Sequence, residues 1–159
     1  MPDIDDVDAE ILGILQQDGR LSNAKLAKQV SLTEPSCWRR VRRLEAEGVI
    51  EGYRAVLNRR SLGLGLLAFV QLGFGQHDPE ATAEMERILS GCPHVLSCHN
   101  TTGEADFLLQ VVAKDLDDYS RFVETVLRKL PGVISVTSNL SLRELKLTGR
   151  LPVSADGTV

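Results

Sequence analysis

The sequence lacks the features of a disulfide-stapled, secreted or membrane-spanning protein. Its three cysteines, Cys37, Cys92 and Cys98, are an odd number at irregular spacing, which argues against a disulfide framework. The longest apolar stretch, residues 62–74, is too short to span a bilayer and is interrupted by glycines and a glutamine. The acidic residues 1–10 contain no apolar segment typical of a signal peptide. We therefore expect a reduced, cytoplasmic protein with no membrane partner.

Recognisable catalytic and metal motifs are also missing. The sequence has no glycine-rich phosphate loop, no G-x-S-x-G nucleophile motif and no H-E-x-x-H zinc motif. Cys92, His94, Cys98 and His99 are potential metal ligands, but Cys98 and His99 are adjacent and would point to opposite faces of a strand. We expect core or surface residues there, no metal, no cofactor and no enzymatic activity.

Positive charge is scarce overall but concentrated in one region. The formal net charge is −4, and residues 1–19 carry six acids and no Lys or Arg. Residues 20–60 carry ten Lys and Arg against four acids, whereas residues 61–159 carry eight against twelve. A basic block confined to a short region is typical of a module that binds phosphate groups.

Residues 5–50 show the pattern of three helices with short connections. In each helix the apolar residues recur every three to four positions, which predicts one buried face. Each helix has a candidate cap: Asp5 or Asp6 for the first, Ser22 for the second and Thr33 for the third. Only three residues separate the second helix from the third. This spacing predicts a helix-turn-helix motif.

The third helix, TEPSCWRRVRRLEAEG, combines a buried stripe with a cluster of arginines. Cys37, Val41 and Leu44 follow helical spacing and are predicted to face the core. Four arginines within five residues lie on or beside the opposite face, where an anionic partner would best explain them. We predict DNA contacts from the motif at Ser22, Thr33, Ser36, Arg39, Arg40, Arg42 and Arg43. Trp38, the single tryptophan, is predicted to pack rather than to stack on DNA.

The rest of the chain has the pattern of alternating strands and helices. Strands are predicted at 66–74 and 107–113, and helices at 79–90 and 116–130. Positions related by an offset of 38 residues are similar: Phe69 and Phe107, Leu89 and Leu127, Pro93 and Pro131. Two strand–helix–strand halves predict the βαββαβ, ferredoxin-like plan. One face of such a sheet carries the helices, and we expect self-association through the other.

Several segments of the chain resemble the Lrp/AsnC transcription regulators: residues 8–58, TTGEADFLLQVV, RKLPGVISV and LRELK. The resemblance covers residues 4–153 and implies an α+β protein, with a winged-type helix-turn-helix domain followed by a ferredoxin-like effector domain. It also implies homodimers that assemble to octamers, binding to double-stranded DNA and a response to an amino-acid effector held at a subunit interface. The predicted parts are a DNA-binding domain (1–52), a linker (53–65), an effector and oligomerisation domain (66–150) and a tail (151–159).

The resemblance places the effector at a G-x-x-D loop. The assigned contacts are Thr102, Gly103, Glu104, Ala105 and Asp106 in the loop, with Ser138 and Leu140 in the last strand. Gly103 permits a tight turn close to a ligand, and Asp106 has the chemistry to accept hydrogen bonds from an α-ammonium group. Many relatives have an aromatic residue where Ala105 stands, so the resemblance does not identify the effector.

Other interpretations remain open from the sequence. The arginines can form a solvated face paired with Glu45 and Glu47, and the loop at Asp106 can be a plain hairpin turn. An architectural DNA-binding protein without an effector would carry the same basic helix. A few proteins that share this two-domain plan are thought to be enzymes, although a catalyst has little reason to keep the arginine-rich helix.

Overall fold

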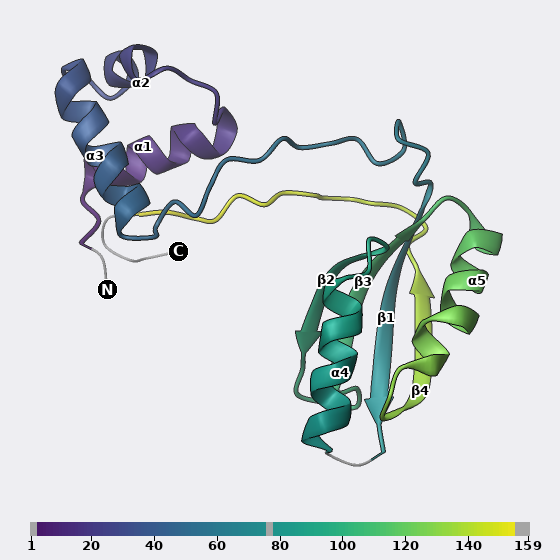
Figure 1. The fold of residues 1–159 in the computed structure, drawn as a ribbon. Helices are drawn as coiled ribbons and strands as arrows, with labels where there is room; N and C mark the ends of the chain where they lie inside the picture. The colour runs from purple at the N-terminus through teal and green to yellow at the C-terminus, as the bar shows by residue number, and fades with distance from the viewer. Residues whose placement is uncertain (1–2, 76–77, 155–159) are drawn as a thin grey trace. The chain divides into compact units, whose positions relative to one another are not determined.

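The computed structural model describes residues 3–75 and 78–154, and within them the chain forms two compact units. The first unit contains the chain up to Val56 and from Lys146 on, and the second is Leu57–Leu145. Three helices belong to the first unit, and a four-stranded sheet with helices α4 and α5 belongs to the second (Figure 1). The predicted order of a helical domain and an α+β domain is confirmed. No helix in the described ranges is long and apolar enough to cross a bilayer.

The helices of the first unit are α1 (Asp6–Gln17), α2 (Asn23–Gln29) and α3 (Glu34–Ala46). Side chains cap the first two helices, because Asp5 accepts the Asp8 N–H at the start of α1 and Ser22 accepts the Lys25 N–H at the start of α2. Thr33 occupies the N-cap position of α3 without making a side-chain capping bond. Gly48, with φ +72°, adopts the left-handed conformation that ends a helix.

The three helices share one apolar core. As predicted, Cys37, Val41 and Leu44 of α3 are buried, and they pack with Ile11 of α1 and Leu26 of α2. After α3, Val49 and Ile50 also pack against this core. Residues 51–58 contain neither helix nor strand, so the described part of the first unit has no wing made of paired strands.

The C-terminal segment packs on the first unit. The side-chain amide of Gln16 donates to the Leu151 carbonyl at 3.1 Å, and the Leu151 N–H donates to Gln16 Oε1 at 2.6 Å. Val153 adds an apolar contact with the helical core. By their contacts, the residues after Leu145 belong to the helical unit. Residues 155–159 of the predicted tail lie outside the described part.

The sheet of the second unit has the strand order β2-β3-β1-β4. Its strands are β1 (Leu66–Phe74), β2 (Val95–Asn100), β3 (Phe107–Ala113) and β4 (Val133–Leu140), and all neighbours are antiparallel. Helix α4 is Pro79–Ser90; α5 is Leu116–Thr125, followed by a 3₁₀ turn at Leu127–Lys129. This is the predicted βαββαβ plan. The last predicted helix is shorter than expected because its final turn tightens to 3₁₀ geometry.

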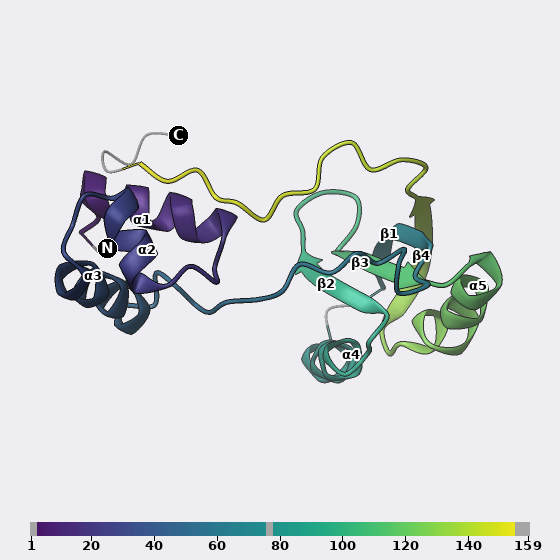
Figure 2. The same ribbon diagram turned by 90° about the horizontal axis from the view of Figure 1, so that it is seen from above.

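Both helices cover the same face of the sheet (Figure 2). The helix-facing positions of β1 are Ala68, Val70 and Leu72, each fully buried, and Phe107 on β3 belongs to the same core. Phe69 points the other way and is 41% exposed. The predicted equivalence of Phe69 and Phe107 is therefore wrong. A one-residue slip moves a strand side chain to the opposite face, so the 38-residue offset does not align β1 with β3, although β2 and β4 begin 38 residues apart, at Val95 and Val133.

Candidate functional site

The four arginines of α3 fall into different environments, although the sequence places them within five residues. The side chains of Arg42 and Arg43 are 64% and 41% exposed, and that of Arg40 is 29% exposed. Arg39 is also exposed. Their partners differ more than their exposure does.

Arg40 and Arg43 are held by acids of the first helix. Nη1 of Arg40 lies 2.7 Å from Asp5 Oδ2 and 2.8 Å from Asp8 Oδ1, and Nη2 of Arg43 donates to Asp8 Oδ2. The carboxylate of Asp8 is fully buried. A hydrogen bond from the Asp8 N–H, followed by the bond from Arg40, lowers the pKa of Asp5. These two arginines therefore join α3 to α1.

Arg42 belongs to a second group of contacts. Its Nη1 lies 3.1 Å from Glu45 Oε2, and its guanidinium lies 6.0 Å from the centre of the Trp38 ring. The hydroxyl of Tyr53 donates to the other oxygen of Glu45 at 3.1 Å. The proposed pairing of arginines with Glu45 thus occurs for Arg42. Trp38 is 49% exposed, so it covers part of this surface without being buried.

Arg39 makes no hydrogen bond or ion pair within the described residues. It lines a surface hollow of about 320 Å³ together with Ser36, Arg40, Arg43 and Asp5. Four of the seven predicted DNA-contacting residues thus lie around one hollow. Of the other three, Arg42 lines a separate hollow, Ser22 caps α2 through the Lys25 N–H at 3.4 Å, and Thr33 begins α3.

The predicted effector loop connects β2 to β3. Gly103 has φ +131°, a conformation that side chains with a Cβ rarely adopt, and an added Cβ there would meet no atom within 4 Å. The Thr101 N–H donates to the Asp106 carbonyl at 2.9 Å, and the Thr101 hydroxyl donates to the Ala105 carbonyl at 2.8 Å. Thr102, Gly103 and Glu104 are exposed at the loop tip. The loop is therefore ordered by its base, and its tip is free to contact a ligand.

Asp106 ties this loop to the end of β1. Its Oδ2 accepts the Phe74 N–H at 2.7 Å, and its own N–H donates to the Leu72 carbonyl at 3.0 Å. The carboxylate thus has a structural role, and Oδ1 has no hydrogen bond among the described residues. The sequence predicted that Asp106 accepts an ammonium group, but it did not predict the hydrogen bond from the Phe74 N–H.

Ser138 and Leu140 lie away from the loop. On β1, Ser138 pairs with Val70 and Leu140 with Ala68, whereas the first residue of β3, Phe107, pairs with Leu72. At 3.3 Å per residue, the four positions from Ala68 to Leu72 span about 13 Å. The hydroxyl of Tyr119 on α5 donates to Ser138 Oγ at 2.5 Å. One chain therefore does not bring the two predicted halves of the effector site together.

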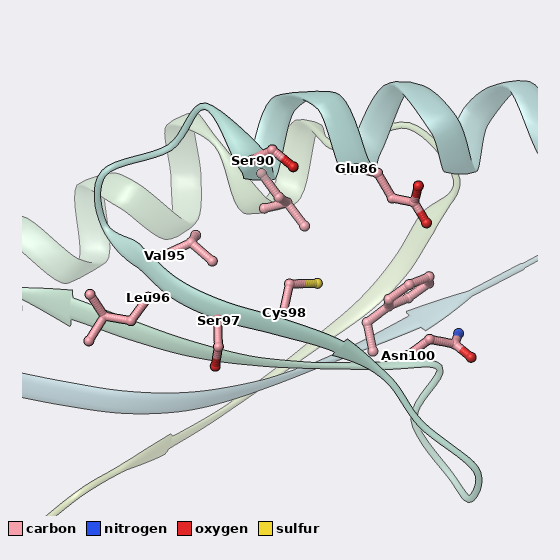
Figure 3. A pocket seen from close by; sticks show the side chains of 9 residues that line it. Glu86, Ser90, Val95, Leu96, Ser97, Cys98 and Asn100 are labelled. Carbon is pink, nitrogen blue, oxygen red and sulfur yellow. The ribbon is translucent and has the colours of Figure 1, made fainter. Parts of the chain in front are cut away.

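A hollow of about 510 Å³ lies between α4 and the edge strand β2 (Figure 3). Glu86 and Ser90 extend into it from α4, and Cys98 and Asn100 from β2. None of the seven predicted effector residues lines this hollow. Burial and the nearby Glu86 carboxylate raise the pKa of the Cys98 thiol, which keeps it protonated at neutral pH. Among the described residues, no three of the histidine, cysteine and acidic side chains are grouped as metal ligands.

The acids that hold the arginines were missed by the sequence reasoning. Asp5 appeared there only as a candidate cap, and Asp8 only as part of an acidic segment. The spacing of Asp5 and Asp8, three residues apart at a helix start, is the signal of a reciprocal capping box. That Asp8 is buried beneath α3 depends on contacts between residues 32 and 35 positions apart, which no local pattern contains.

Comparisons with known proteins agree with this architecture. Residues 4–45 match the model of the AsnC-type helix-turn-helix domain, and residues 67–151 match that of the Lrp/AsnC ligand binding domain. The DNA-binding transcriptional activator DecR of Escherichia coli K12 is 35% identical over 150 residues, covering 94% of this chain and 99% of the relative. The leucine-responsive regulatory protein of the same strain is 35% identical over 151 residues, covering 95% of this chain and 92% of the relative.

Solved structures give the same result. A transcriptional regulator of Neisseria meningitidis in complex with L-methionine has a TM-score of 0.91 at 37% identity, covering 94% of this chain and 96% of that chain. A feast or famine regulatory protein of Mycobacterium tuberculosis, complexed with L-methionine, has a TM-score of 0.80 at 29% identity, covering 94% and 99%. The relatives named are regulators, which removes the support for a same-fold enzyme.

Proposed function

Because the chain belongs to the Lrp/AsnC family of transcriptional regulators, we propose that α3 binds the major groove of double-stranded DNA and that the second unit senses an amino acid. The observation that carries the DNA-binding part is Arg39, which has no hydrogen-bond or ion-pair partner among the described residues and lies beside Ser36, Arg40 and Arg43 in one exposed hollow. An exposed guanidinium without a carboxylate partner is available for a phosphate or a base edge. A regulator that binds DNA in this way would act in the cytoplasm.

The N-terminal half of α3 is the part that reads DNA in this proposal. In a helix-turn-helix protein the first residues of the recognition helix face the base edges, and Thr33 and Ser36 stand there beside Arg39. In the same proposal Ser22, the N-cap of α2, contacts the phosphate backbone. Arg42 is paired with Glu45 and lies against Trp38, so we expect it to contribute less to direct DNA contact than Arg39.

The effector part rests on the loop at residues 101–106. Relatives of this chain from Neisseria and Mycobacterium are solved with L-methionine, which makes an α-amino acid the class of ligand to test. Asp106 Oδ1, which accepts no hydrogen bond from the described part of the chain, suits an α-ammonium, and the backbone at Gly103 permits close approach of a carboxylate. Ser138 and Leu140 would complete the site from a second subunit, because one chain keeps them apart.

A homodimer through the open face of the sheet is also proposed. Ser138 and Leu140 lie opposite Val70 and Ala68 on the helix-facing side, so they would complete the effector site at a different contact between copies. The open face of the sheet carries Phe69, which is 41% exposed and uncovered by either helix, and a copy of the same face is its proposed partner. Assembly of dimers to an octamer is what the family resemblance implies. Two copies also place two α3 helices on one duplex, which predicts a pseudo-palindromic site with half-sites spaced by whole helical turns.

One experiment tests both parts of the proposal. A duplex is selected by the full-length protein from a random-sequence library, and its affinity is measured against a scrambled duplex with and without each of the twenty amino acids. We expect salt-sensitive binding, preference for the selected duplex and a change of about 5- to 150-fold with one amino acid, the range of typical allosteric coupling. Binding that no amino acid changes would favour an architectural protein, and no DNA binding would refute the proposal. Thermal-shift screening with the same amino acids checks ligand binding independently of DNA.

A further inference from the structure

The buried carboxylate of Asp8 is an unusual feature of the helical unit. Among the described residues it is the one charged side chain that is buried, and it lies in a core otherwise formed by Ile11, Leu12, Cys37 and similar apolar residues. Both of its oxygens are occupied by α3: Oδ1 by Arg40 at 2.8 Å and Oδ2 by Arg43. A carboxylate placed beneath the recognition helix thus binds two of its four arginines.

Asp5 closes the network from the helix end. Its Oδ1 accepts the Asp8 N–H at 2.8 Å, its Oδ2 accepts Arg40 Nη1 at 2.7 Å, and its own N–H donates to Asp8 Oδ2 at 3.3 Å. Among the described residues, no buried side-chain nitrogen or oxygen lacks a hydrogen-bond partner. The capping box of α1 and the arginines of α3 therefore form one connected, satisfied group, the Asp5–Asp8–Arg40–Arg43 network.

Stability alone is a weak reason for this arrangement. Removing two charges from water is costly, and apolar residues of similar volume often stabilise a core as well as a buried ion pair does. What a fully bonded network adds is a fixed geometry, because each guanidinium donates to carboxylate oxygens that are themselves held in place. The side-chain orientation of Arg40 and Arg43 is thus determined by α1.

The same contacts limit how these arginines meet DNA. Each guanidinium has five N–H donors, and Arg40 and Arg43 each use one nitrogen on the acids, so the others remain for a ligand. The carboxylates also offset the charge that α3 presents beside Arg39. A guanidinium fixed in this way binds a base edge in one defined position better than it binds phosphates at variable positions.

We propose that Asp5 and Asp8 are positioning residues for DNA recognition: they orient Arg40 and Arg43 beside Arg39 and keep them from pairing freely with phosphates. This inference rests on the proposed role of α3 in the major groove. It assigns part of the sequence discrimination to a helix that need not touch a base. It also predicts that loss of an acid strengthens non-specific binding while it weakens preference for the selected site.

The test uses the full chain with Asp5→Asn and Asp8→Asn, and Asp6→Asn as the control. Asp6 is exposed, makes no hydrogen bond or ion pair within the described residues, and loses the same charge on substitution. Affinity is measured for the selected and the scrambled duplex across about 50–200 mM salt, the range over which phosphate contacts change binding strongly. Asp5→Asn retains a side-chain oxygen that accepts the Asp8 N–H, so α1 keeps its cap in this variant. The test therefore does not depend on Asp8→Asn, which can unfold the unit.

For Asp5→Asn we expect the ratio of selected to scrambled affinity to fall at least about fivefold, the lower end of what one base contact contributes. The slope of log K against log salt for the scrambled duplex should steepen by up to about 0.9, one added phosphate contact. A ratio and slope equal to those of Asp6→Asn would overturn the inference. If Arg39→Ala binds DNA more weakly while the acid variants match Asp6→Asn, only the positioning role is wrong. If the wild-type protein does not bind DNA, the proposed function is wrong.

Discussion

The different partners of Arg39 and Arg43 lead to opposite expectations for two similar substitutions. Both residues are on α3, both are exposed, and both become alanine, a good helix former. Arg43→Ala leaves the fully buried Asp8 with Arg40 as its remaining ion-pair partner. Removing one partner of a buried pair costs about 3–5 kcal/mol, and the 41% exposure of Arg43 and the remaining Arg40 reduce this to about 2 kcal/mol. Arg39→Ala removes no described contact and should change stability by less than about 0.5 kcal/mol.

Urea unfolding followed by tryptophan fluorescence measures this difference. Trp38 is the single tryptophan and lies on α3, so its signal reports the helical unit. With a slope of about 1 kcal/mol per molar urea for so small a unit, Arg43→Ala should lower the midpoint by about 2 M at fixed protein concentration. Arg39→Ala should leave the midpoint in place and weaken DNA binding by about 1–3 kcal/mol. Equal midpoints for the two variants would refute the division of roles.

Three further predictions concern acid, the C-terminal segment and the effector loop. The pKa of Asp5 is lowered from 3.8 in the folded state, so its stabilising contribution is complete above that pH and is lost as pH falls through the folded value; the urea midpoint should drop more steeply below about pH 4 in wild type than in Asp5→Asn. Gln16→Ala removes both hydrogen bonds to Leu151, should cost about 1–2 kcal/mol, and should speed amide hydrogen exchange at Leu151; unchanged exchange would show that the segment docks without Gln16. Gly103→Ala forces a Cβ into positive φ and should lower the stability of the second unit by about 1–2 kcal/mol in a thermal melt, whereas Thr102→Ala, its exposed neighbour, should not.

Local patterns predicted the elements well because the signals that define them are local. The caps at Asp5 and Ser22, the buried stripe on α3 and the βαββαβ order all follow from residues within a few positions of one another. The alignment of β1 with β3 failed for the opposite reason. Phe69 and Phe107 are both aromatic, yet which face each one occupies depends on the register between strands, and one residue of slip reverses it.

The effector site shows a second limit of the sequence. The loop at Gly103 and the last strand were predicted as one site by resemblance, and the pairing of β1 with both β3 and β4 keeps them apart within a chain. The register, which is a property of the sheet, separates the two halves within one chain, and this is why the proposed site takes Ser138 and Leu140 from another copy. Likewise, the hydrogen bond from the Phe74 N–H to the Asp106 carboxylate joins residues 32 positions apart. No local pattern contains this bond, so the sequence assigned the whole Asp106 carboxylate to the ligand.

The charge of the recognition helix depends on its neighbours as much as on its own residues. Counting bases in residues 20–60 gives a strongly positive block, but Asp5 and Asp8 precede that block and lie against two of its arginines. A carboxylate within hydrogen-bond distance offsets a guanidinium locally, and the excess that DNA meets is smaller than the count. Arg39 is unpaired among the described residues, so it contributes more than a quarter of the attraction that the four arginines exert on DNA. The acids of α1 thus belong to the DNA-binding apparatus, although their charge alone would argue against it.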